Sequence, residues 1–102
     1  LELDFLNDLM STISWLRGHY TNKKNLPYLE EVIRRDKNGL MTDAAGIAES
    51  MKPKTKKSIR NSMRVLKSRS LITYDESKKP HVYKPTQLGK YVVKMFYNDQ
   101  NE

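Results

Sequence analysis

Apolar residues recur at helical spacing in the first part of the chain. Between Leu3 and about Tyr20 they fall three or four residues apart, at Leu6, Leu9, Met10, Ile13, Leu16 and Tyr20. Since this spacing places side chains on one face of an α-helix, we predict an N-terminal helix over residues 1–20. Phe5 and Trp15 lie off this face. Two interpretations of them remain open: they cover the edges of the core, or they belong to a second contact surface, such as one with another subunit.

A second helix is predicted after a polar run. Residues 21–25 are polar and are expected at or just after the end of the first helix. The second helix is expected from about Pro27 to Asp36, because proline suits the first helical turn. The dipeptide Asn38-Gly39 is expected to close it, since glycine readily takes the left-handed angles of a helix end. Residues 40–41 are expected to form a very short strand.

Residues 42–70 have the pattern of two helices joined by a turn. The first begins with Thr42-Asp43, which suits an N-cap and first turn, and continues as a short Ala-rich segment that can pack closely. Pro53 is expected to end it, because proline lacks an N–H and disfavours helical angles in the preceding residue. A longer helix is predicted from about residue 54 or 55 to Arg69. Its apolar face consists of Ile59, Met63 and Leu66.

A small β-hairpin is predicted over residues 71–84. Its strands are expected at 71–74 and 81–83, where β-branched and aromatic residues flank a polar, basic turn. Pro85 is expected to end the second strand, because proline cannot donate a backbone hydrogen bond.

A final helix is predicted over residues 86–98, with Thr86 as its cap. Its apolar residues repeat at helical spacing and are Leu88, Tyr91, Val92, Met95 and Phe96. The polar tail 98–102 is expected to fray. The chain is therefore predicted to be a single domain over residues 1–102, mainly α with a small β-hairpin.

Positive charge is concentrated in one third of the chain. The whole chain has a formal net charge of +7, whereas residues 52–84 contain eleven basic and two acidic side chains and have a local net charge of +9. Such a local excess favours a polyanionic partner. A basic run is often only a solvated helix face, but its position beside a turn, with a second basic group in the hairpin, favours DNA binding.

Residue types that several chemistries need are missing. The chain has no cysteine, and its histidines are His19 and His81 alone, so disulfides, thiolate catalysis and cysteine-ligated zinc are excluded. We expect no metal and no other cofactor. No nucleophile elbow or glycine-rich phosphate loop is present, which argues against an enzyme. No apolar run approaches the roughly 18 residues of a membrane-spanning helix, so we expect no membrane partner and a cytoplasmic location, at the nucleoid in a prokaryote.

The order of predicted elements resembles the winged helix-turn-helix domain of MarR-, PadR- and ArsR-type regulators and of small plasmid or viral DNA-binding proteins. The resemblance covers about Leu26 to Phe96. It depends on three short motifs: Ile47-Ala48-Glu49-x-Met51, then Ile59 with Leu66-x-x-Arg69-Ser70-Leu71-Ile72, then Tyr83-x-x-Thr86-x-x-Gly89. Two features depart from the family pattern: Ser70 replaces a common glycine, and the turn at 52–55 is one residue longer and contains Pro53.

The resemblance implies that the basic helix enters the DNA major groove and that the hairpin touches the adjacent backbone or minor groove. Asn61 is expected to read adenine, and Arg60 or Arg64 guanine, because these side chains can make paired hydrogen bonds to a base edge. The lysines and hydroxyls are expected to hold phosphates. The full set of predicted DNA-binding residues is Lys52, Lys54, Thr55, Lys56, Lys57, Ser58, Arg60, Asn61, Arg64, Lys78, Lys79 and His81.

A homodimer is expected, because a core drawn from a chain with 37% hydrophobic residues is modest and a partner subunit would add burial. The resemblance likewise implies a dimer joined by terminal helices. The predicted interface residues are Phe5, Trp15, Phe96 and Tyr97.

The leading functional hypothesis is sequence-specific binding of double-stranded DNA by a transcriptional regulator. A plasmid-partition or replication protein and an architectural DNA-binding protein fit the same features. An alternative of another class is a winged-helix module that binds an acidic protein or RNA. Steep salt dependence on duplex DNA would favour the first group, and salt-tolerant protein binding would favour the second.

Overall fold

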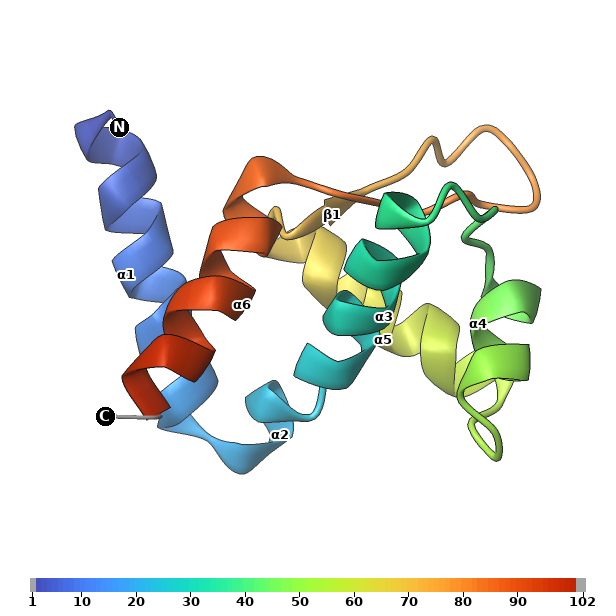
Figure 1. Ribbon diagram of the computed structural model, residues 1–102, viewed down its shortest axis with the longest axis horizontal. Helices are drawn as coiled ribbons and strands as arrows, with labels where there is room; N and C mark the ends of the chain where they lie inside the picture. Colours follow the sequence, from blue (N-terminus) through green and yellow to red (C-terminus); the bar gives the residue numbers. More distant parts are fainter. Residues whose placement is uncertain (1, 101–102) are drawn as a thin grey trace.

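The computed structural model describes residues 2–100, and the side chains of residues 2–97. The fold is mainly helical with a two-stranded antiparallel sheet, as predicted, and its elements are easily followed in Figure 1. They are α1 (Leu3–Gly18), α2 (Tyr20–Lys23), α3 (Leu26–Lys37), α4 (Ala44–Ser50), α5 (Lys56–Ser68), β1 (Ile72–Thr73), β2 (Lys84–Pro85) and α6 (Gln87–Gln100). Within the described part of the chain, no helix is both long and apolar enough to cross a bilayer.

The first helix is shorter than predicted, and a further short helix follows it. His19 has extended backbone angles (φ −155°, ψ 138°), which end α1 at Gly18. The N–H of Thr21 donates to Nδ1 of His19 at 3.2 Å, so the histidine caps α2. The predicted continuous helix to Tyr20 is therefore wrong, because this local cap turns the chain.

The second predicted helix is confirmed, and the strand expected after it is wrong. Helix α3 is followed by Asn38 and by Gly39, whose φ of +68° is the left-handed angle expected at this helix end. Residues 40–41 form no strand. Instead, the N–H of Tyr83 donates to the carbonyl oxygen of Thr42 at 2.8 Å. This hydrogen bond joins the α3–α4 loop to Tyr83, the residue that precedes β2.

Both helices of the 42–70 segment form, each with a side-chain cap. Asp43, and not Thr42, caps α4: its Oδ1 accepts the N–H of Gly46 at 2.8 Å. Thr55 caps α5, because its Oγ1 accepts the N–H of Ser58 at 3.1 Å. Pro53 lies in the connection between the two helices. These caps explain why the basic helix begins at Lys56.

The strands of the hairpin are shorter than predicted; the first lies within its predicted range, and the second lies elsewhere. β1 and β2 pair antiparallel with Ile72 opposite Pro85. Pro85 is the last residue of the second strand, which it was expected to end. The predicted strand at 81–83 is wrong. The N–H of Tyr83 donates to the α3–α4 loop instead, so this segment does not pair with β1. The loop 74–83 therefore projects from a very small sheet.

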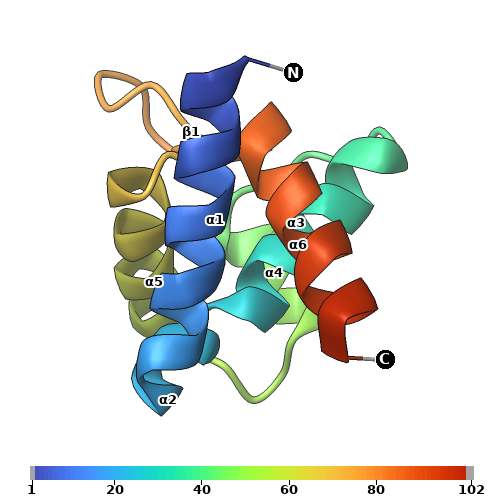
Figure 2. The same ribbon diagram turned by 90° about the vertical axis from the view of Figure 1, so that its left-hand side faces the viewer.

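The last helix is capped as predicted by Thr86, whose Oγ1 accepts the N–H of Gly89 at 3.0 Å. It continues to Gln100, and residues 101–102 of the polar tail lie outside the described residues. Helices α1 and α6 lie side by side at one end of the molecule, and α4, α5 and the hairpin loop lie toward the other (Figures 1 and 2). A common core joins them, and its completely buried side chains include Leu29, Val32, Ile47, Ile59, Met63, Leu71 and Val92.

Candidate nucleic-acid interface

Helix α5 presents a basic face to solvent. Its opposite side, formed by Ile59, Met63 and Leu66, is buried in the core and fixes the rotation of the helix. The exposed polar residues of the helix include Lys56, Lys57, Arg60, Asn61 and Arg64. Within residues 2–100 none of the four cations of this face forms an ion pair. Their charge is therefore not neutralised by the fold.

The hairpin loop meets this face at a shared hollow. Cations from two separate segments, Lys56 and Arg60 of α5 and Lys79 of the loop, line a hollow of about 510 Å³ together with His81. Its remaining wall comes from Asp43 and the start of α4, and from Pro80 and Tyr83. Residues that are about twenty positions apart in the sequence are thus brought around one opening on the surface.

Lys67, near the end of α5, binds the hairpin loop. Its Nζ donates to a carboxylate oxygen of Glu76 at 2.9 Å and to the carbonyl oxygen of Tyr74 at 3.3 Å. The ammonium group also lies 4.3 Å from the centre of the Tyr74 ring. The hydrogen bond and the charge of Lys67 lower the pKa of Glu76. The sequence shows Lys67 only as one basic residue among many, and nothing in it indicates that this one holds the loop.

Aromatic stacking and a local turn give the hairpin loop its shape. The ring of His81 lies 4.7 Å from that of Tyr74, which in turn meets the buried Tyr83 edge-on at 5.2 Å. Burial raises the pKa of Tyr83. The carboxylate of Asp75 accepts the N–H of Ser77 at 2.9 Å and its hydroxyl at 2.6 Å, which lowers the pKa of Asp75. The loop is therefore held by its own contacts.

The predicted DNA-binding residues around the α4–α5 turn differ in whether their polar groups already have partners within the fold. Lys54 is exposed, whereas Lys52 pairs with Glu49 at 3.1 Å, an exposed ion pair that contributes little. Thr55 uses a lone pair to cap α5 and keeps its O–H proton for an acceptor. Ser58 is half-buried, with its Oγ 3.2 Å from the hydroxyl oxygen of Tyr28. Ser58 thus lies at the edge of the basic face, next to α3.

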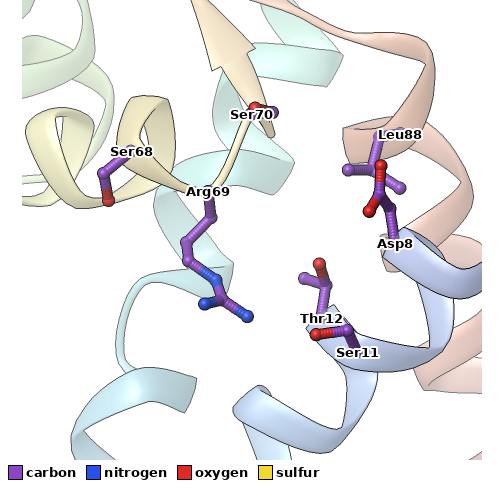
Figure 3. A pocket seen from close by; sticks show the side chains of 7 residues that line it. All are labelled: Asp8, Ser11, Thr12, Ser68, Arg69, Ser70 and Leu88. Atoms are coloured by element: carbon purple, nitrogen blue, oxygen red, sulfur yellow. The ribbon is translucent and has the colours of Figure 1, made fainter.

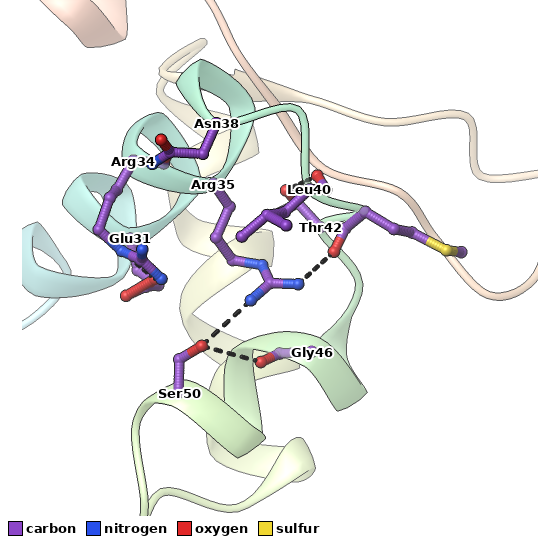
Figure 4. A network of polar contacts seen from close by, with 9 residues as sticks. Glu31, Arg34, Arg35, Asn38, Leu40, Thr42, Gly46 and Ser50 are labelled. Carbon is purple, nitrogen blue, oxygen red and sulfur yellow. Dashed lines mark hydrogen bonds and ion pairs between the residues drawn. The ribbon is translucent and has the colours of Figure 1, made fainter.

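A half-buried arginine, Arg35, holds α4 against α3 (Figure 4). The guanidinium of Arg35 donates to Oγ of Ser50 at 3.1 Å and to the carbonyl oxygen of Met41, and Ser50 donates to the carbonyl oxygen of Gly46 at 3.2 Å. A Cβ at Gly46 would lie 2.6 Å from Nη2 of Arg35. The glycine therefore leaves room for the guanidinium, and this contact sets the position of α4 and of the turn that leads to α5.

The predicted interface aromatics pack largely within the chain. Phe5 lies edge-on to Tyr91 at 5.6 Å, and both Phe5 and Trp15 are half-buried against the core, in line with the first of their two interpretations. Phe96 is 1% exposed, so its side chain cannot contact a second copy of the chain. Tyr97 is at the surface, where its hydroxyl donates to Glu30; burial and this carboxylate raise the pKa of Tyr97 to about 12.

A second hollow, of about 220 Å³, lies where α1 approaches the end of α5 and the start of α6 (Figure 3). It is polar and is lined by Asp8, Ser11, Thr12, Ser68, Arg69, Ser70 and Leu88. In the described part of the chain, no group of three or more histidine, aspartate or glutamate side chains is placed to hold a metal ion. The basic surface of α5 and the hairpin is therefore the strongest candidate site.

Comparison with protein-family models, with curated proteins and with solved structures finds no match for this chain. The functional argument accordingly depends on the chain's own residues: a basic helix with unpaired cations, a hairpin loop fixed to it by Lys67, and a hollow that both share.

Proposed function

We propose that the chain is a winged helix-turn-helix domain that binds double-stranded DNA in a sequence-specific manner. Helix α5 enters the major groove, and the hairpin acts as the wing on the adjacent backbone or minor groove. One observation carries the proposal: Lys56 and Arg60 of α5 converge with Lys79 and His81 of the loop around one hollow. The negatively charged phosphates of a DNA backbone would neutralise the positive charge of these residues.

We assign the side chains of α5 to different roles in the proposed complex. An α-helix with its side chains is about 10–12 Å wide and fits a major groove about 12 Å wide. Asn61 and Arg64 are exposed on α5 and do not line the hollow, so we assign them to base edges. Arg60 lines the hollow and lies at the junction of base and backbone contacts. Lys56 and Lys57 are assigned to phosphates.

Among DNA-binding roles, we favour a homodimeric transcriptional regulator. Exposed apolar side chains support an association surface at α1: Leu3 is 72% exposed and Met10 is 70% exposed. In a two-fold dimer the recognition helices would lie about 34–36 Å apart and protect a roughly palindromic site. A partition or replication protein would use the same contacts, so the target DNA distinguishes these roles.

The test is binding of the purified chain to a random-sequence duplex and to duplexes selected from a random pool, each at about 50 to 200 mM salt. The proposal requires that affinity falls steeply with salt and that one selected sequence is preferred at the higher salt. Equal binding to all duplexes would replace the regulator with an architectural role. Absence of duplex binding would overturn the proposal and favour a module that binds protein or RNA.

A further inference from the structure

The short helix α2 and its neighbours form a second basic surface. Lys23 and Lys24 are exposed, and Tyr20 is 70% exposed. The chain has no acidic side chain from residue 9 to residue 29, and neither lysine forms an ion pair within the described residues. The DNA-binding contacts expected from the sequence do not include this segment.

Aromatic rings hold both lysines in place without neutralising them. Nζ of Lys24 lies 5.1 Å from the centre of the Tyr20 ring, and Nζ of Lys23 lies 5.6 Å from that of Phe96. The ring of Tyr20 is itself stacked on His19 at 4.7 Å. A cation over a ring keeps its full charge. Phe96 belongs to α6, so its contact directs Lys23 toward α6, whereas the ammonium group of Lys24 stays beside α2 and remains available to an anion.

Helix α2 flanks α5 on the side opposite the hairpin. Lys56, Arg60 and Lys67 face the hairpin, as the shared hollow and the Lys67 contacts show. On the other side of α5, the guanidinium of Arg69 lies over the ring of Trp15, 4.7 Å from its centre. The side chain of Asn22 donates to the carbonyl oxygen of Trp15 at 2.8 Å, which fixes α2 next to this flank.

The two views agree with this placement. In Figure 2 the hairpin loop, α5 and α2 follow one another down the same side of the molecule, with α5 between the other two. Helix α6 packs against α1 and α3 and lies away from this side. The basic surface thus has three parts in a row.

A helix in the major groove has a phosphate strand on each side, because the groove is bounded by both backbones. The hairpin is placed to contact one strand. We propose that the segment 19–24 contacts the other strand through Lys24, so that the duplex is held on both sides of α5. This inference depends on the proposed function, and it adds a contact that the helix-turn-helix and hairpin alone do not provide.

The experiment compares two single variants with equal loss of charge. Lys24→Gln removes the proposed contact, and Lys94→Gln removes an exposed lysine from α6 as a matched control. Each phosphate contact contributes about 0.9 to the slope of log affinity against log salt, so the first variant should reduce the slope by about 1. Its affinity at about 100 mM salt should fall several-fold, equally on preferred and random duplexes.

The control variant should keep the wild-type slope, and circular dichroism should show the same melting temperature for both variants. Equal slopes for Lys24→Gln and Lys94→Gln would overturn the inference. Arg60→Gln/Lys79→Gln separates this failure from failure of the proposed function. If Arg60→Gln/Lys79→Gln weakens binding and Lys24→Gln does not, only the second-strand contact is wrong. If the wild-type chain does not bind duplex DNA, the proposed function itself is wrong.

Discussion

Gly89 of α6 packs directly on the backbone of Leu71, so closely that a Cβ built on Gly89 would lie 2.2 Å from the Leu71 carbonyl oxygen. That oxygen also accepts the N–H of Thr86 at 3.1 Å, at the start of α6. The carbonyl cannot withdraw without loss of this bond. The contact brings the last helix against the segment that leads from α5 into β1.

Gly89→Ala should therefore lower the free energy of unfolding by about 1–3 kcal/mol, because the backbone of α6 or of Leu71 must move. Urea denaturation followed by circular dichroism measures the change. Gly18→Ala is the control: nothing lies within 4 Å of a Cβ at Gly18, and alanine is the better helix former. Equal stability of the two variants would contradict the close contact.

Arg35→Lys should destabilise the chain by about 1–2 kcal/mol, since the bonds to Ser50 and to the carbonyl of Met41 come from two guanidinium nitrogens and a lysine has a single nitrogen to replace them. The neighbouring Arg34→Lys alters only an exposed pair with Glu31, so it should cost less than about 1 kcal/mol. Thermal and urea unfolding of both variants give the comparison. A larger loss for Arg34→Lys would show that Arg35 does not hold α4.

Lys67 should make the hairpin sensitive to acid. Because the folded-state pKa of Glu76 is below its ordinary value of 4.5, the contact is fully stabilising above pH 4.5 and is lost as the pH falls through the lowered value. An NMR titration of the Glu76 carboxyl carbon should give a midpoint below 4.5 in the wild type. In Lys67→Gln the midpoint should return toward 4.5, and an unchanged midpoint would exclude the contact as its cause.

Arg64→Ala and Lys57→Ala should weaken DNA binding in different ways. Loss of a base contact at Arg64 should remove about 1–3 kcal/mol of discrimination between preferred and altered duplexes. Loss of a phosphate contact at Lys57 should weaken all duplexes alike and reduce the salt slope by about 1. Fluorescence anisotropy on a set of single-base variants separates the two patterns. The assignment of roles fails if Lys57→Ala alone changes the sequence preference.

Met10→Lys should convert the expected homodimer into a monomer, because it places a charge in the exposed apolar surface of α1. Sedimentation equilibrium at micromolar concentration measures the mass. Met41→Lys is the matched control, since Met41 is 58% exposed on the α3–α4 loop. A monomeric wild-type chain would rule out the dimer, and a dimeric Met10→Lys variant would place its interface elsewhere.

Apolar spacing was enough to predict the long helices, because the buried faces of α3, α5 and α6 each come from one local repeat. It did not predict α2, which depends on a hydrogen bond between His19 and Thr21. The second strand was placed wrongly because the N–H of Tyr83 donates to Thr42, a residue 41 positions earlier. Such pairings are decided by the tertiary structure and leave no periodic signal.

For the candidate site, the sequence predicted which cations lie on the exposed face of α5, since the apolar stripe fixes the opposite face. It did not distinguish the cations that the fold itself uses. Lys67 and Arg69 look like their neighbours in the sequence, yet one binds Glu76 and the other covers Trp15. Only the three-dimensional neighbours of each side chain decide between these uses.

The attachment of the hairpin loop to α5 through Lys67 has a consequence for the kinetics of association. A loop that were disordered in the free protein would lose conformational entropy at the moment of binding, and this would oppose complex formation. Here the loop is ordered when the chain folds, by contacts that involve no ligand. The loop is therefore preorganised for the proposed complex, so release of the Lys67 contact should slow association even where every side chain proposed to contact DNA is intact.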